Sequence, residues 1–208
     1  MTMIVIVDYG MGNLRSVEKA IASIGASSLI SNDPDAISKA DKLVIPGVGA
    51  FGDCMNNIRA YGIEDAVKQF IAKGRPTIGI CVGMQMLFEG GDENPGVKGL
   101  GLMKGSVKGF DHVQLAGKGL KIPHMGWNTV KQGKKSFLFE GIKDKSYFYF
   151  VHSYYPAPLD DITIGTTDYG IDFTSVVQKD NVVATQFHPE KSQKNGLRLL
   201  SNFINYRG

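Results

Sequence analysis

The pentapeptide Gly79-Ile80-Cys81-Val82-Gly83 constrains the fold of this chain more than any other segment. It ends an apolar run, Thr77–Ile80, that indicates a buried strand, and a helix-forming stretch over residues 84–88 comes directly after it. A G-x-C-x-G sequence between a strand and a helix is typical of a nucleophile elbow, a strained turn that presents a reactive side chain. Glycine is expected on both sides of the cysteine, because a side chain there would crowd the backbone or cover the nucleophile.

The first ninety residues alternate between strand and helix patterns. Helical spacing of apolar residues begins after Asn13, a good N-cap, and a shorter helix is expected from Pro34. The expected strands are Ile4–Val7, Ser28–Ser31, Lys42–Ile45 and Thr77–Ile80, and two further helices are expected around Asp53–Arg59 and Ile63–Lys73. This alternation predicts an α/β fold with a central, mostly parallel sheet and helices on both faces.

The second half of the chain has a different pattern, loop-rich at first and then rich in strands. The expected strands are Val107–Phe110, Trp127–Val130, Tyr147–Val151, Ile162–Thr167, Ser175–Lys179 and Val182–Phe187. The turn at residues 179–181 predicts a hairpin between the last two, and a final amphipathic helix, Gln193–Asn205, follows Ser192 as its N-cap. We therefore expect an antiparallel C-terminal extension of the sheet, and we interpret residues 1–208 as a single domain.

Composition excludes several classes of function. The net charge is only +3, which gives no reason to expect nucleic acid, and no apolar stretch approaches the ~20 residues of a membrane span. The first eight residues lack a basic region and a cleavage site, so they indicate a strand and not a signal peptide. Two cysteines are too few for a disulfide framework, which fits a cytoplasmic protein.

No metal or cofactor is expected. The histidines, cysteines and carboxylates show no zinc spacing. The segment Gly10-Met11-Gly12 resembles the start of a dinucleotide loop, but Arg15 stands where the G-x-G-x-x-G pattern needs its third glycine.

Three residues are candidates for an activated-thiol triad. Cys81 at a helix N-terminus is favoured as a thiolate, although a buried cysteine is usually inert core. His188 and Glu190 lie two residues apart in Phe187-His188-Pro189-Glu190, so an extended backbone puts both side chains on one face. A carboxylate there can orient the imidazole as a general base. The alternative for this pair is a surface ion pair.

The remaining candidates concern the oxyanion hole and the other titratable groups. The N–H of Val82 is one possible donor, and the loop Pro46–Ala50 is suitable for the second, although it could be a plain βα turn. Cys54 is interpreted as structural. His112, His124 and His152 lack a carboxylate at a useful spacing, but His124 and His152 could line a site.

Together these segments resemble the class I glutamine amidotransferase family, in which a Cys-His-Glu triad hydrolyses the side-chain amide of glutamine. The resemblance covers nearly the whole chain, and it is strongest to the branch that supplies ammonia to a cyclase in histidine biosynthesis. Sister glutaminases carry Gly-Gly before an acidic residue or proline where this chain has Pro46–Gly49. The segments that carry the resemblance are residues 8–14, 46–51, 79–85, 95–101, 124–128, 152–155 and 186–192.

The resemblance implies a flavodoxin-like fold and a role for each matching residue. Cys81 would attack the carboxamide, His188 would move the proton and Glu190 would hold His188. Gly49 and Val82 would lie at the oxyanion hole. The residues implied in glutamine binding are Gln85, Glu93, Ser153 and Tyr154. Those implied at the interface with the cyclase, a (β/α)8 barrel that forms a heterodimer with the glutaminase, are Asn13, Met125, Trp127 and Lys191.

Other functions remain open at this point. The chain could be the glutaminase of another class I amidotransferase, in pyridoxal phosphate or guanylate synthesis, or a stand-alone cysteine hydrolase. A binding protein with a decayed site is disfavoured by the complete triad. The segment Gly109–Lys121 aligns with no motif. Because an always-active glutaminase would waste glutamine, we expect low activity until the partner carries its nucleotide substrate.

Overall fold

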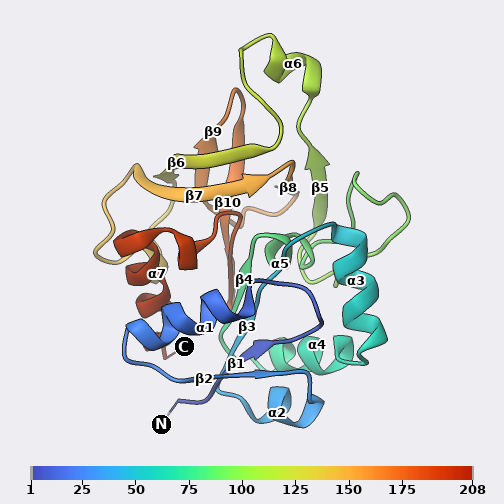
Figure 1. The fold of residues 1–208 in the computed structure, drawn as a ribbon, viewed down its shortest axis with the longest axis vertical. Coiled ribbons are helices and arrows are strands. Elements are labelled where there is room, and N and C mark those ends of the chain that lie inside the picture. The colour runs from blue at the N-terminus through green and yellow to red at the C-terminus, as the bar shows by residue number, and fades with distance from the viewer. Residues whose placement is uncertain (1, 208) are drawn as a thin grey trace.

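The computed structural model describes residues 2–207, which form one nine-stranded mixed sheet, a separate two-stranded sheet and flanking helices (Figure 1). The parallel part consists of β1 (Ile4–Val7), β2 (Ser28–Ser31), β3 (Lys42–Ile45), β4 (Thr77–Ile80) and β11 (Val182–Thr185). The antiparallel part consists of β10 (Asp172–Lys179), β9 (Thr163–Asp168), β6 (His124–Gln132) and β7 (Ser146–His152). The strand order is β2-β1-β3-β4-β11-β10-β9-β6-β7, so β11 joins the two parts.

The helices cover both faces of the parallel part, as the sequence predicts. Parallel strands are joined by right-handed crossovers, and the chain moves outward from β1 to β2 but back across β1 to β3. This reversal puts α1 (Leu14–Ser23) on one face and α2 (Pro34–Lys39) on the other. Accordingly α1 contacts α7 (Gln193–Asn205), and α2 contacts α4 (Glu64–Ala72), which follows α3 (Phe51–Ala60). Figure 1 shows the two groups on either side of β1 and β3.

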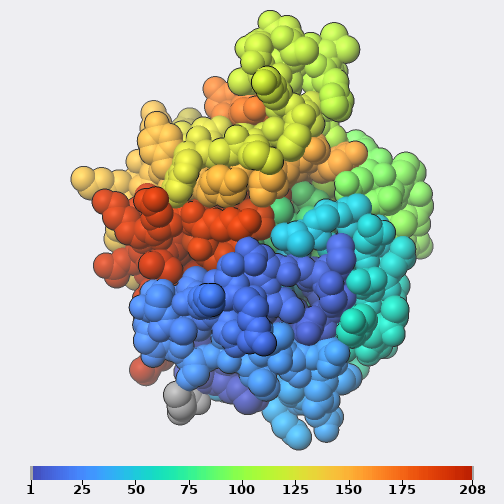
Figure 2. Space-filling model, viewed as in Figure 1, coloured from blue at the N-terminus to red at the C-terminus, as the bar shows by residue number. Residues whose placement is uncertain are grey.

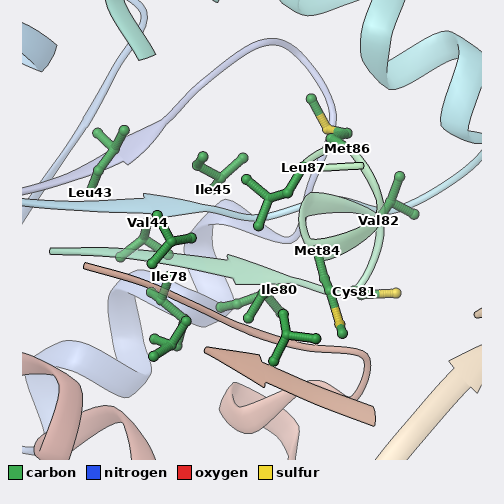
Figure 3. Close-up of a cluster of buried hydrophobic side chains, with 14 of the residues drawn as sticks. Leu43, Val44, Ile45, Ile78, Ile80, Cys81, Val82, Met84, Met86 and Leu87 are labelled. Atoms are coloured by element: carbon green, nitrogen blue, oxygen red, sulfur yellow. The ribbon is translucent and has the colours of Figure 1, made fainter. Parts of the chain in front are cut away.

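The core lies where the parallel strands are buried on both faces. Every residue of β1, β3, β4 and β11 is buried, which explains why these strands are largely apolar instead of alternating between apolar and polar residues. Figure 3 shows that Cys81 comes directly after β4, with its sulfur pointing away from the neighbouring core side chains. Because β4 and β11 are parallel neighbours, with Ile80 opposite Thr185, the segments that follow them meet at the same edge of the sheet.

Some elements differ from the sequence predictions. Strand β8 (Tyr154–Pro158) was not expected, since it holds two prolines; it pairs with β5 (Gly105–Gly109) in the small sheet. Helix α5 spans Val82–Gln85, so it begins and ends earlier than the stretch 84–88 suggests. Asn13 and Ser192 hold the N-cap positions of α1 and α7, but neither side chain caps its helix.

Short helical turns account for much of the loop-rich region. The segment Gly109–Lys121 contains α6 (His112–Ala116), whose N-cap Asp111 accepts from the N–H groups of Val113 and Gln114. This segment projects from the top of the molecule in Figures 1 and 2. Two 3-10 turns, η1 (Phe137–Phe139) and η2 (Pro189–Lys191), complete the elements.

Within residues 2–207, no helix has the length and apolar character to cross a bilayer.

Candidate active site

The elbow forces Cys81 into a strained backbone conformation. Cys81 is the N-cap of α5 and has φ of 56°, a value that residues with a side chain rarely adopt. A Cβ on Gly83 would lie 1.9 Å from the carbonyl oxygen of Ile45, and one on Gly79 would lie 2.8 Å from that of Gly83. The expected crowding at both glycines is confirmed, and it explains how α5 packs so closely on β3 and β4.

The structure brings Cys81, His188 and Glu190 together at the edge where β4 and β11 end. The Nδ1 of His188 lies 2.8 Å from Oε1 of Glu190, and these side chains are only 2% and 1% exposed. They are therefore not a surface ion pair. The backbone holds His188 in place, because its N–H donates to Tyr149 and its carbonyl accepts from the Ser192 hydroxyl. Among residues 2–207, the buried Nε2 of His188 has no hydrogen-bond partner.

The electrostatics of His188 favour its protonated form. Burial by itself lowers the pKa of His188, but the thiolate of Cys81 and the carboxylate of Glu190 outweigh it and raise the pKa to about 10. An imidazolium beside a cysteine sulfur is the arrangement of an activated thiol, in which the thiolate attacks and the imidazolium protonates the leaving amine.

A cavity of about 270 Å³ opens over the Cys81 sulfur, and most of the predicted site residues line it. The lining residues are Val48, Gly49, Cys81, Val82, Gln85, Glu93, Pro123, Val151, His152, Ser153, Tyr154 and His188. All residues predicted for the oxyanion hole and for glutamine binding are in this set. Of the four others, His152 was named as a residue that could line a site, and Val48 lies in the predicted loop Pro46–Ala50, whereas no pattern indicated Pro123 and Val151.

Buried donors orient the loop that follows β3. The Tyr9 hydroxyl donates to the Pro46 carbonyl, and the Cys54 thiol lies 3.5 Å from the Val48 carbonyl. Since the C=O and N–H of a planar trans peptide point in opposite directions, the N–H of Gly49 points away from Cys54. Neither this N–H nor that of Val82 donates to another group within residues 2–207. Both residues line the cavity, so these two N–H groups are the candidate donors to an oxyanion there.

Glu93 has a second role that the sequence did not indicate. Its Oε2 accepts from the Phe51 N–H at 2.7 Å, and the neighbouring Asn94 accepts from the Gly52 N–H at 2.8 Å. These bonds satisfy two free N–H groups at the start of α3. The carboxylate of Glu93 is thereby fixed at the cavity wall, where it can receive an ammonium group.

The residues predicted for a partner interface lie outside this cavity. Met125 and Trp127 on β6 are 62% and 45% exposed. The Trp127 ring lies 6.1 Å from that of Tyr149, over which the Lys191 Nζ lies at 5.9 Å. Asn13 precedes α1, which contacts the turn η2 that carries Lys191. The sequence analysis did not single out Tyr149. Its position beside Trp127 becomes visible only in the structure, where the two residues are opposite each other in the β6–β7 ladder.

A buried histidine pair separates the cavity from this surface. His124 Nδ1 lies 2.9 Å from His152 Nε2, and His152 Nδ1 lies 2.8 Å from the Tyr154 carbonyl. A carbonyl can only accept, so His152 carries its proton on Nδ1, and its Nε2 accepts from His124. Burial lowers the pKa of His124 to about 4 and that of His152 to about 3, with a further lowering of the latter by His124. Both rings are therefore neutral at pH 7.

This pair is expected to make the fold sensitive to acid. The unfolded chain binds protons on both histidines below pH ~6.5, whereas the folded chain does not until about pH 4 and 3. The free energy of unfolding is therefore unaffected by this pair above pH ~6.5, and it decreases as pH falls from there towards 4. For His124→Phe, whose ring can stack as His124 does on Phe150 and Tyr169, the decline should be shallower by roughly 1.4 kcal/mol per pH unit. Urea unfolding followed by circular dichroism at pH 7, 5.5 and 4.5 measures this, and parallel profiles for the two proteins would contradict it.

Comparisons with known proteins agree with the geometry. The family model described as "Glutamine amidotransferase class-I" matches residues 5–206. The chain is 50% identical to "Imidazole glycerol phosphate synthase subunit HisH" of Sulfurimonas denitrificans over 99% of both chains, and 50% identical to the protein of that name from Thermococcus kodakarensis over 97% of this chain and 98% of the relative.

Solved structures share the fold at lower identity. One described as a glutamine amidotransferase has a TM-score of 0.74 at 21% identity and covers 96% of each chain. The structure of PurLQS from Thermotoga maritima has a TM-score of 0.73 at 16% identity, covering 99% of this chain and 98% of that one.

Proposed function

This chain belongs to the class I glutamine amidotransferase family and is a glutamine-hydrolysing enzyme, and we propose that it is the glutaminase subunit of an imidazole glycerol phosphate synthase in histidine biosynthesis. The observation that carries the proposal is the buried Cys81–His188–Glu190 arrangement beneath a cavity in a chain 50% identical to relatives of that name. The partner is a cyclase with a (β/α)8 barrel, which forms a heterodimer with this chain. Glutamine is the small-molecule substrate.

The reaction begins with attack of the Cys81 thiolate on the carboxamide of glutamine. The N–H groups of Gly49 and Val82 bind the resulting oxyanion. His188, held by Glu190, protonates the leaving nitrogen, so that neutral ammonia departs and a thioester remains. His188 then takes a proton from water, whose oxygen attacks the thioester and releases glutamate.

The cavity walls match a free amino acid. Glu93 receives the ammonium of glutamine, and Gln85, Ser153 and Tyr154 bind its carboxylate and side-chain amide. This assignment follows from charge: a carboxylate fixed at the wall suits the ammonium, and the amide and hydroxyl groups suit the remaining polar atoms. The cavity of about 270 Å³ admits a small amino acid and excludes a folded polypeptide.

Ammonia passes to the cyclase as NH3, because protonated ammonium is not a nucleophile. The exposed Met125 and Trp127 on β6, with Lys191 and Asn13 nearby, form the docking surface. A stand-alone hydrolase would not need these exposed side chains. The loop Pro46–Gly49 and the near-complete coverage of the relatives disfavour the amidotransferases of pyridoxal phosphate or guanylate synthesis.

Glutamate release in four mixtures tests the proposal: this chain alone, with the cyclase subunit of its own organism, with the nucleotide substrate of that cyclase, and with both. We expect release to rise at least about tenfold only when both are present, since loop rearrangement on complex formation can complete a site. Equal turnover in all four mixtures would contradict the partner assignment.

A matched pair of variants tests the docking surface. Trp127→Ala is expected to weaken binding to the cyclase about tenfold or more in calorimetry, as truncation of a central interface tryptophan usually does. Leu29→Ala serves as the control, because Leu29 is similarly exposed, 48% against 45%, but lies on β2 at the opposite end of the sheet. A similar loss for both variants would show that the surface is elsewhere.

A further inference from the structure

Gln186 is a buried polar residue that the mechanism above does not use. It follows β11, two residues before His188, and its side chain is inaccessible to solvent. Its Nε2 lies 3.7 Å from the sulfur of Cys81, within hydrogen-bonding range of a sulfur acceptor. Its Oε1 accepts from Nε2 of Gln85 at 3.1 Å. The amide therefore bridges the nucleophile and a residue of the substrate cavity.

The direction of this amide is fixed by its neighbours. The Nε2 of Gln85 lies 3.1 Å from both the Tyr154 carbonyl and Oε1 of Gln186. A carbonyl can only accept, so Gln85 must turn its NH2 group to Tyr154, and the second hydrogen of that group is donated to Gln186. Gln186 consequently presents its oxygen to Gln85 and its own NH2 group to Cys81.

The histidine pair supports the far end of this network. His152 Nδ1–H donates to the same Tyr154 carbonyl at 2.8 Å, so both lone pairs of that oxygen are engaged. His124 in turn donates to His152 and lies 3.3 Å from the amide nitrogen of Asn128. The hydrogen bonds from His124 through His152 and the Tyr154 carbonyl to Gln85 can thus be assigned in one way only, and this assignment fixes the orientation of the Gln186 amide.

We propose that Gln186 is a further catalytic residue, which donates an N–H hydrogen bond to the Cys81 sulfur and is held in that orientation by Gln85 and the Tyr154 carbonyl. The bond is strongest when the sulfur is anionic, because hydrogen bonds to charged acceptors are stronger than those between neutral groups. It therefore stabilises the thiolate before attack and again when the thiolate leaves the thioester. The inference rests on the proposed function, since it adds a group to the nucleophile of that site.

Alkylation of Cys81 by iodoacetamide as a function of pH tests the bond without relying on glutamine turnover. Gln186→Met removes both the donor and the acceptor at similar shape, whereas Gln186→Glu keeps the acceptor for Gln85 and removes the donor. Gln178→Met is the matched control. Gln178 is a half-buried glutamine on β10, away from the cavity, and its side-chain oxygen accepts a hydrogen bond from the Ser136 hydroxyl. Mass spectrometry locates the label, and circular dichroism verifies folding.

We expect the pH midpoint of Cys81 alkylation to rise by about one unit or more in both Gln186 variants and to be unchanged in Gln178→Met. In the complex with the cyclase, kcat for glutamine hydrolysis should fall about 10-fold to 100-fold, with KM changed less than about threefold. If Gln186→Met does not fold, the uncharged Gln186→Leu takes its place, because the carboxylate of Gln186→Glu also repels the thiolate and by itself raises the midpoint.

Two results would overturn the inference. An unchanged midpoint in both variants would show that the amide does not donate to the sulfur, and a wild-type midpoint in Gln186→Glu alone would show that Gln186 serves only to position Gln85. Failure of the proposed function is distinguishable from these results. In that case the wild-type chain would hydrolyse no glutamine in any of the four mixtures, while the Gln186 variants would still show a higher alkylation midpoint than wild type.

Discussion

Cys81→Ala is expected to lower glutamine hydrolysis about 10⁴-fold or more, the largest loss of activity that a single substitution in this chain should cause. Without the sulfur no thioester can form, and His188 has no proton to exchange with a nucleophile. The fold should be kept, because alanine has the same Cβ as cysteine in the strained conformation with φ of 56°. Glutamate release in the complex with the cyclase and its nucleotide measures the loss.

Two observations separate loss of chemistry from loss of the site. Calorimetry should show that Cys81→Ala still binds glutamine and the cyclase, since neither surface depends on the sulfur. A glutamine-derived diazoketone should label wild type on Cys81 and leave the variant unlabelled, although Cys54 is present in both. Residual hydrolysis above about one hundredth of wild type, or labelling of Cys54, would show that Cys81 is not the nucleophile.

Gly83→Ala is expected to cause the largest loss of stability. The added methyl would lie 1.9 Å from the carbonyl oxygen of Ile45, a backbone atom in the buried strand β3 that cannot move aside like a flexible side chain. Overpacking at such a site costs about 3–5 kcal/mol, a large part of the 5–15 kcal/mol that stabilises a typical domain. For a chain of this size the melting temperature should fall roughly 6–20 °C, measurable by circular dichroism.

Gly25→Ala is the control that separates collision from backbone strain. Gly25 has φ of 81°, yet no atom lies within 4 Å of its added Cβ. That variant should lose only about 1 kcal/mol, from the left-handed conformation alone. If Gly83→Ala melts within a few degrees of Gly25→Ala, then α5 can retreat from β3, and the close packing is not what maintains the elbow.

The parallel half of the fold was predictable because its signals are local. The first four strands occupy the residues expected. Three of them, β1, β3 and β4, are short and largely apolar segments buried on both faces, whereas β2 is a partly exposed edge strand. The pairing of His188 with Glu190 was also predicted, but the reason given was wrong: Glu190 lies in the 3-10 turn η2, and not on an extended backbone, when its carboxylate meets His188. The elbow followed from glycines whose necessity is now explained by specific collisions.

The parts that were not predicted depend on contacts between distant segments. Strand β8 contains two prolines and is a strand only because β5 pairs with it. Gln186 stands 101 positions from Gln85 and 105 from Cys81, so no spacing in the sequence connects them. The sequence analysis named His124 and His152 as residues that could line a site, but nothing in the sequence indicated that their rings are buried and bonded to each other. Such relations become visible only when the sheet order is known.

The position of β11 in the sheet has a consequence for the order of events during synthesis. This strand lies between β4 and β10 and, within residues 2–207, joins the parallel and antiparallel parts of the main sheet. It also delivers His188, more than one hundred residues after Cys81 has left the ribosome. Closing so long a loop is slow, because contacts between distant segments form late. A nascent chain therefore exposes its elbow without a base, and the thiol becomes reactive only in the molecule whose two half-sheets have been joined.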